Sequence, residues 1–265
     1  MESIDTDARG RGLAAAPTLP PVDLTGFTPA QVAFAAAAWP MRAAEELRSA
    51  LIFRALARAA GAANLPEPWT KRFEAMVVDE VGHARLCAEV GSRLGAARPQ
   101  YDARPVRARL ADLTDAMGRT TALLLVEAAI GETISMALFR AGRRAATEPL
   151  TRAALSAILA DEVRHQRNGW TGITALWPNL SGPDRETLQR EATNGLAAFE
   201  RQVAVPALRR LEAGEPFDPA FAALGVLAPE ARVDAFYRAV EHLVVPRLTA
   251  LGLDGARAWS ERYRR

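Results

Sequence analysis

Apolar residues recur every three to four positions along most of this chain, which is the spacing of one face of an α-helix. The apolar material is mainly Ala, Leu and Val with few aromatic residues, a composition that favours helices over strands. No stretch makes a convincing strand. The pattern predicts an all-α protein with four main helices and two further ones near the C-terminus. The predicted helices span about 28–60, 70–95, 107–146, 151–176, 184–212 and 229–251.

Local signals indicate where the first three helices begin, bend or end. Thr28 suits an N-cap, Pro29 suits the first helical position, and Gln31 stands where the partner in a capping box would be. Pro40 predicts a kink or a break in the first helix, and Gly118 allows a break in the third. The segment 98–105, RPQYDARP, reads as a linker.

Three regions follow from this pattern. Residues 1–27 are expected to form a disordered or loosely wrapped tail. Residues 28–178 contain the four main helices, and residues 179–265 add C-terminal helices that should pack on them. At 265 residues, the chain is long enough for one large domain with a sizeable core.

Composition narrows the classes of function. The formal net charge is only +2, and no basic cluster is dense enough to indicate nucleic-acid binding. The single cysteine, Cys87, excludes an intrachain disulfide and fits a reducing compartment. The N-terminus lacks the apolar segment of a signal peptide, and no other stretch reaches eighteen apolar residues without a charge. We therefore expect a cytoplasmic protein without a membrane partner.

Part of the chain is repeated. Glu46–Gly61 resembles Glu132–Thr147, and both copies read E-x-x-S-x-x-x-F-R-A. The sequence EPWTKRFEAMVVDEVGH then resembles EPLTRAALSAILADEVRH, which has one additional residue. A repeat of this size indicates a duplicated helical hairpin.

Each copy of the repeat ends in a D-E-x-x-H motif. The motifs are DEVGH, with Glu80 and His83, and DEVRH, with Glu162 and His165, in a chain that has only three histidines. On a helix, residues three apart lie on one face, so each Glu and His can reach the same metal ion. One such motif is weak evidence, but two inside a repeated hairpin are strong evidence for a metal site.

Each copy also carries a glutamate one helix earlier, Glu46 and Glu132. One Glu from each of two helices, plus Glu-x-x-His from each of two others, is the ligand set of di-iron carboxylate bundles. Over about residues 30–176 the chain thus resembles the ferritin-like superfamily. The resemblance implies a ferritin-like four-helix bundle that holds two iron ions, with Mn or mixed Mn/Fe as alternatives. It also implies that Glu80 and Glu162 bridge the metals, with Glu46 and His83 on one and Glu132 and His165 on the other.

The third-helix glutamate has a rival in Glu127. Measured along the helices, Glu132 lies at the height of its partners, whereas Glu127 adds a mismatch of about 7 Å. The spacing from Glu127 to Glu162 is, however, closer to that from Glu46 to Glu80. A bulge near Gly131 would reconcile the two arguments. We favour Glu132 and leave Glu127 as an extra ligand, a carboxylate behind the ligands, or an exposed residue at a kink.

Asp79 and Asp161 precede the two motif glutamates. A histidine that binds a metal usually donates its other N–H to a carboxylate or a carbonyl. In related di-iron oxygenases that carboxylate comes from the opposite motif, so the resemblance pairs Asp79 with His165 and Asp161 with His83. The third histidine, His242, lacks the motif, and Cys87 is expected to pack as a small apolar residue.

The function that the resemblance favours is that of an O₂-dependent di-iron oxidase or oxygenase acting on a small organic substrate. N-oxygenation, hydroxylation and desaturation all occur on this scaffold, and such enzymes need an external electron donor. The alternatives are a ferroxidase or iron store and, less favoured for lack of a basic patch, a tRNA-modifying di-iron hydroxylase. The C-terminal helices could close a cavity or form a homodimer interface.

Overall fold

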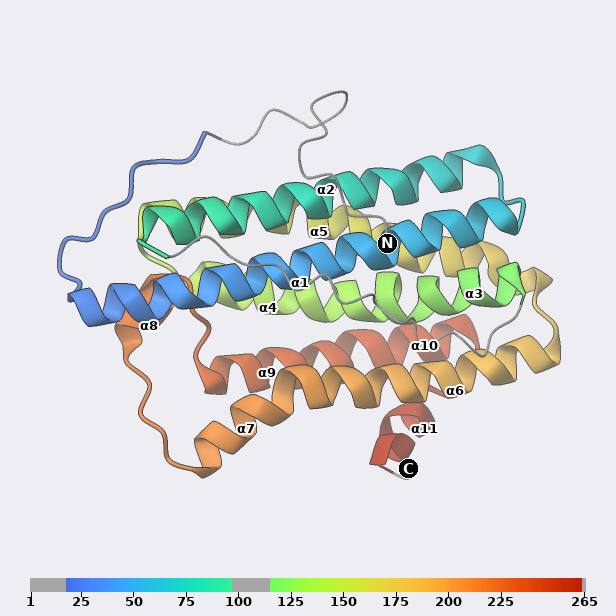
Figure 1. The fold of residues 1–265 in the computed structure, drawn as a ribbon. Helices are drawn as coiled ribbons and strands as arrows, with labels where there is room; N and C mark the ends of the chain where they lie inside the picture. The colour runs from blue at the N-terminus through green and yellow to red at the C-terminus, as the bar shows by residue number, and fades with distance from the viewer. Residues whose placement is uncertain (1–17, 97–114, 264–265) are drawn as a thin grey trace.

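The computed structural model describes residues 18–96 and 115–263, and every regular element among them is helical, which confirms the predicted all-α class. Figure 1 shows the long helices lying lengthwise beside one another. The elements are α1 (Pro29–Ala62), α2 (Glu67–Arg93), α3 (Ala116–Leu123), η1 (Leu124–Gly131), α4 (Glu132–Ala145), α5 (Pro149–Leu176), η2 (Trp177–Asn179), α6 (Gly182–Phe199), η3 (Glu200–Ala204), α7 (Val205–Glu212), α8 (Pro219–Ala223), α9 (Pro229–Ala239), η4 (Val240–Val244), α10 (Val245–Leu251), α11 (Gly255–Ser260) and η5 (Glu261–Tyr263).

Four long helical segments form the part of the fold that carries the predicted motifs. α1 packs along α2, α5 packs against η1 and α4, and α2 contacts α5. α3, η1 and α4 follow one another without a gap from Ala116 to Ala145. The elements α6–η3–α7 and α9–η4–α10 lie along one side of these segments (Figure 1).

The stretch Ala116–Ala145 passes the length and composition test for a membrane span, alone among the helices that the structure describes. Of its most apolar window, 72% is buried inside the protein. Burial of this extent is what the central helix of a globular core requires, so apolarity here is explained by packing.

The predicted start of the first helix is confirmed, and of the kink or break predicted at Pro40 the break is absent. Thr28 and Gln31 form a capping box, and α1 then runs through Pro40 to Ala62. A Cβ placed on Gly91 of α2 would lie 3.2 Å from Pro40 Cδ, so the proline ring packs where α2 has no side chain. This contact helps to stabilise a helix that lacks one backbone hydrogen bond.

The described part of the predicted tail, residues 18–27, lies against the core. Leu19, Val22, Leu24 and Phe27 pack against the core, and the Asp23 backbone N–H donates to Glu148 Oε1 at 3.0 Å. Apolar side chains at close spacing anchor this segment without regular structure. Residues 1–17, the predicted linker at 98–105 and the predicted helix start at Arg107 lie outside the described residues.

Within residues 18–96 and 115–263, three stretches widen from α- to π-helix: η1, η3 and η4. Two of them end just before a proline, η3 before Pro206 and η4 before Pro246. A proline ring clashes with the carbonyl group four residues earlier in an α-helix, and a wider turn relieves that clash. The predicted helices at 184–212 and 229–251 are therefore present, each interrupted by a π-helical segment.

Candidate metal centre

Six side chains with metal-binding chemistry come together between the long helices. α1 supplies Glu46, α2 supplies Glu80 and His83, and α5 supplies Glu162 and His165. Glu132 is the first residue of α4. All six residues are buried, and none of them is more than 6% exposed. Burial of four carboxylates in one place is costly unless a positive charge compensates for it.

The six residues form two overlapping groups. Glu46, Glu80, His83 and Glu162 each place a ligand atom within 4.8 Å of the others, and so do Glu80, Glu132, Glu162 and His165. Glu80 and Glu162 belong to both groups. Each group could therefore hold a metal ion, and the two shared carboxylates lie where they could contact both ions.

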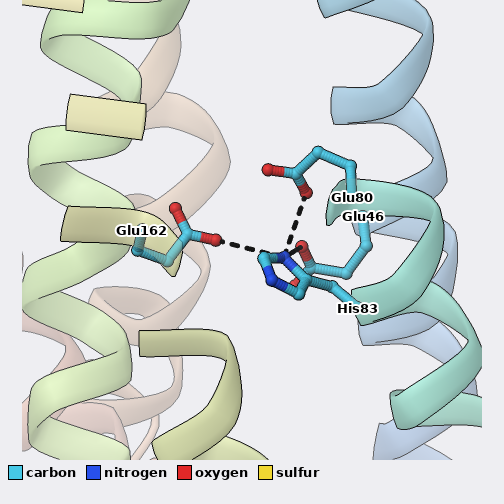
Figure 2. Close-up of side chains that lie close together, drawn as sticks. All are labelled: Glu46, Glu80, His83 and Glu162. Carbon is cyan, nitrogen blue, oxygen red and sulfur yellow. Dashed lines mark ion pairs between the residues drawn. The ribbon is translucent and has the colours of Figure 1, made fainter. Parts of the chain in front are cut away.

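Both histidines turn the same ring nitrogen towards the carboxylates. His83 Nδ1 lies 3.7 Å from Glu46 Oε2, 3.6 Å from Glu80 Oε2 and 3.5 Å from Glu162 Oε1 (Figure 2). His165 Nδ1 lies 2.9 Å from Glu80 Oε1 and 3.8 Å from Glu162 Oε2. These approaches are not aligned as hydrogen bonds, so Nδ1 of each ring has no hydrogen-bond partner among the described residues.

The opposite nitrogen of each ring is paired with an aspartate of the other motif. His83 Nε2 lies 3.1 Å from Asp161 Oδ2, and His165 Nε2 lies 3.0 Å from Asp79 Oδ2. An aspartate that accepts the Nε2–H proton leaves Nδ1 as a lone-pair donor, which is the tautomer that a metal requires. The structure thus contains the two cross-pairings that the resemblance implies.

One arginine joins the two aspartates. Arg164 Nη2 lies 2.9 Å from Asp79 Oδ2 and 2.9 Å from Asp161 Oδ1. The position that corresponds to Arg164 in the first motif is Gly82. This difference between the repeat copies was the available sequence signal for Arg164, and its contact with both aspartates is visible only in the structure.

Several buried polar atoms in the cluster have no hydrogen-bond partner within the described part of the chain. They are both carboxylate oxygens of Glu80, one oxygen each of Glu132 and Glu162, and Nδ1 of both histidines. Buried polar atoms normally have a hydrogen-bond partner, because an atom without one loses its hydrogen bonds to water and gains none within the protein. Six such atoms on residues of the two groups indicate that the cluster is arranged around a partner that accepts lone pairs, as a cation does.

The charges of the cluster perturb one another strongly. Burial raises the pKa of Glu132 to about 8 and raises the pKa of Glu46 well above its ordinary value. Burial, reinforced by Glu132 and Glu80, also raises the pKa of Glu162. Burial alone would raise the pKa of Glu80, but contacts with both histidines lower it to about 2. Without a cation, protons must therefore neutralise part of the cluster, and a bound metal would displace them.

The two histidines respond in the opposite direction. Burial alone would lower the pKa of His165, but Asp79 and Glu80 raise it to about 10. Asp161, Glu46 and Glu80 likewise raise the pKa of His83, against the effect of burial. Imidazolium is the state that best compensates the carboxylates in the absence of any other cation.

The π-helical segment η1 decides which third-helix glutamate enters the cluster. Glu132 follows η1 directly and belongs to the second group, whereas Glu127 lies inside η1 and belongs to neither group. A π-turn adds a residue to each turn and so changes which side chains face inward. Phe199 of α6 covers this stretch, because its Cζ would lie 3.0 Å from a Cβ on Gly131.

A hydrogen-bonded set behind Glu132 was missed by the sequence analysis. Thr133 Oγ1 donates to the Ala129 carbonyl oxygen at 2.6 Å and accepts from Trp170 Nε1 at 3.0 Å and from Gln166 Nε2 at 3.3 Å. Gln166 follows His165 and replaces Ala84 of the first motif. This difference between the repeat copies was the available signal.

Cys87 and His242 take no part in the cluster. Cys87 is fully buried in the apolar core around Trp39, and His242 is exposed in η4. No family model matches the chain, and a comparison with curated proteins finds no match. The chemistry of this protein must therefore be inferred from the geometry of the cluster.

Proposed function

We propose that this protein is a non-haem di-iron oxidase or oxygenase on a ferritin-like four-helix bundle. The observation that carries the proposal is the pair of buried groups that share Glu80 and Glu162, with both Nδ1 atoms directed inward and unpartnered among the described residues. Two carboxylates common to two ligand groups are what a bridged pair of metals uses.

The donor set fits two divalent ions by charge and by type. Four carboxylates would balance two divalent cations, and each half of the chain would contribute a matching set. Oxygen and imidazole ligands without a thiolate favour Fe or Mn over a structural zinc. Glu46 and His83 would complete one metal position, and Glu132 and His165 the other.

The protein residues would do two things around such a centre. The iron pair would supply the redox chemistry with O₂, with an external donor returning electrons. Asp161 and Asp79 would hold the Nε2 protons of His83 and His165 and so fix both rings. The apolar residues around the cluster would exclude bulk water, which strengthens electrostatic interactions inside the site.

Anaerobic titration with Fe(II) tests the proposal. We expect about two irons per chain, as the ligand set of a di-iron bundle implies. Admission of O₂ should then consume oxygen and oxidise the iron, and added reductant should restore the Fe(II) state for further cycles. The particle mass should correspond to a monomer or a small oligomer.

Three outcomes would contradict the proposal. Binding of one iron or none would remove the di-iron centre. A hollow assembly of many subunits that accumulates iron as mineral would indicate an iron store instead. Oxidation of bound iron that cannot be cycled by any reductant would also indicate iron handling rather than substrate oxidation.

A further inference from the structure

A groove of about 710 Å³ lies between the C-terminal half of α5, η2 and α10. Its volume falls within the range of about 300–1,000 Å³ that is typical of small-molecule sites. Gln166 and Trp170 line the groove, whereas Glu162 and His165 of the same helix belong to the metal groups. The groove and the candidate metal centre therefore use different faces of α5.

The groove is positively charged. Arg167 and Arg247 both line it, and none of the described residues that line it is acidic. Arg247 Nη1 is buried and has no hydrogen-bond partner in the described part of the protein. Burial lowers the pKa of Arg247, with no carboxylate acting against that shift. Arg247 as a whole is half-buried and lines the groove, so its remaining guanidinium N–H groups are the ones that can donate to an anion there.

The apolar lining of the groove includes two indole rings with fixed positions. Trp170 donates from Nε1 to Thr133 Oγ1 at 3.0 Å, and Arg247 Cζ lies 5.5 Å from the centre of a Trp170 ring. Trp177 is contacted by Arg185, whose Cζ lies 5.0 Å from the ring centre. Rigid aromatic walls suit a planar apolar ligand, because little conformational entropy is lost on binding.

We propose that this groove binds a small organic anion with a planar apolar body. The Arg247 guanidinium binds the anionic group by donating hydrogen bonds to it. The planar apolar body of the ligand lies against the Trp170 side of the groove. Arg167 is exposed and adds long-range attraction at the mouth. The site does not depend on the proposed di-iron function, since no candidate metal ligand lines it.

Thr133 connects this groove to the candidate metal centre. Gln166 and Trp170 reach from the groove wall to Thr133 Oγ1, and Thr133 is the residue after Glu132. A ligand that lies against Trp170 would therefore be one hydrogen bond away from the residue that follows Glu132.

Calorimetric titration of the full chain with 2-naphthoate and its neutral isostere 2-naphthamide tests the proposal. We expect naphthoate to bind at least about tenfold more tightly than the amide, because hydrogen bonds to a charged group are the strong ones. Arg247→Gln should weaken naphthoate binding by about 10–100-fold, and Arg167→Gln by only a few-fold. Arg247→Lys, which keeps the charge but not the planar fork, should fall between wild type and Arg247→Gln.

Arg238→Gln is the matched control. It removes the same charge from an exposed arginine of α9 that pairs with Asp234 at 2.6 Å and does not line the groove, so naphthoate affinity should be unchanged. The proposal is overturned if acid and amide bind equally, if neither binds, or if Arg247→Gln binds as wild type does. Displacement of naphthoate by equimolar inorganic phosphate would also overturn it, because the planar body would then contribute nothing. Iron binding should persist in all these variants, so failure here is distinguishable from failure of the di-iron proposal.

Discussion

Gly169→Ala should damage the candidate metal centre without touching any of its ligands. Gly169 lies in α5, where a Cβ would sit 2.2 Å from the backbone carbon and oxygen of Ala128 and 2.5 Å from the Ala129 backbone nitrogen. Real Cβ atoms do not approach backbone so closely, and the backbone of η1 cannot rotate away as a side chain can. α5 and η1 must therefore separate by about 1 Å, which is the shortfall from ordinary van der Waals contact.

The expected loss of stability follows from two opposing terms. Overpacking of a well-packed interior costs about 1–3 kcal/mol, and a backbone clash belongs at the upper end of that range. Replacement of a mid-helix glycine by alanine returns about 1 kcal/mol through helix propensity. The net change should be a loss of about 2 kcal/mol in the free energy of unfolding, or about 4–8 °C in Tm for a chain of this size.

Urea unfolding of the metal-free protein, followed by circular dichroism, measures this change. Gly142→Ala is the matched control, because Gly142 lies in α4 and its added Cβ would meet only Leu155 Cδ1 at 3.7 Å. The free energy of unfolding of that variant should rise by about 0.5–1 kcal/mol. Because Ala128 and Ala129 lie shortly before Glu132, Gly169→Ala should also lose iron from the second group before the first. A Gly169→Ala protein as stable as wild type would refute the close approach of α5 to η1.

Three further predictions concern the ligands, the paired aspartates and the C-terminus. Glu132→Ala should lose one of two bound irons while Glu127→Ala keeps both, and iron counting by inductively coupled plasma spectrometry would show the reverse if Glu127 were the ligand. Asp161→Asn should weaken iron affinity by about 10–100-fold through His83, measured by competition with a chelator, and an unchanged affinity would exclude a role for the pairing. Glu200 accepts from Arg262 Nε at 2.8 Å, Tyr237 Oη at 2.7 Å and Tyr263 Oη at 2.6 Å; burial alone would raise its pKa, but these hydrogen bonds lower it. The ionised Glu200 therefore stabilises the fold fully above its unfolded-state pKa of about 4.3, and this stabilisation is lost as pH falls through the lower folded-state pKa. The difference in the free energy of unfolding between wild type and Glu200→Gln should be constant from about pH 7 to 5 and should shrink below about pH 4. A gap that widens on acidification would contradict that sign.

The helical class and most helix starts were predictable because their causes are local. The capping box at Thr28 and the proline at position 29 act within a few residues, and the structure has both. The second and fourth helices begin two to three residues before the predicted starts at about 70 and 151, because their first turns take in the prolines at 68 and 149. The continuation of the first helix through Pro40 has a tertiary cause, because the ring is accommodated by Gly91 on another helix. The short helices α8 and α11 were missed, since five or six residues are too few to show a helical period.

The six candidate ligands could be picked out because the spacing and repetition of their motifs are visible in a sequence, whereas their division into two groups was implied only by the resemblance to di-iron bundles. The choice between Glu127 and Glu132 was not determined in the same way, since it depends on the width of the turns in η1. The groove beside α5 could not be predicted from the sequence, for a different reason. Its residues come from α5, η2 and α10, and nothing in the sequence indicates that these segments adjoin.

Arg164 shows what a fused duplicate can do that a symmetric pair of chains cannot. Its Nη2 atom lies 2.9 Å from an aspartate of each repeat, so one guanidinium group contacts both motifs. In an assembly of two identical hairpins, each copy would bring its own arginine to these aspartates, and two guanidinium groups would compete for one space and repel each other. Within one chain, the first copy carries Gly82 and the second carries the arginine, so a single guanidinium group lies between the two aspartates. Fusion thus removes the constraint of exact self-complementarity, and the two halves of the site are free to diverge in the tasks they perform.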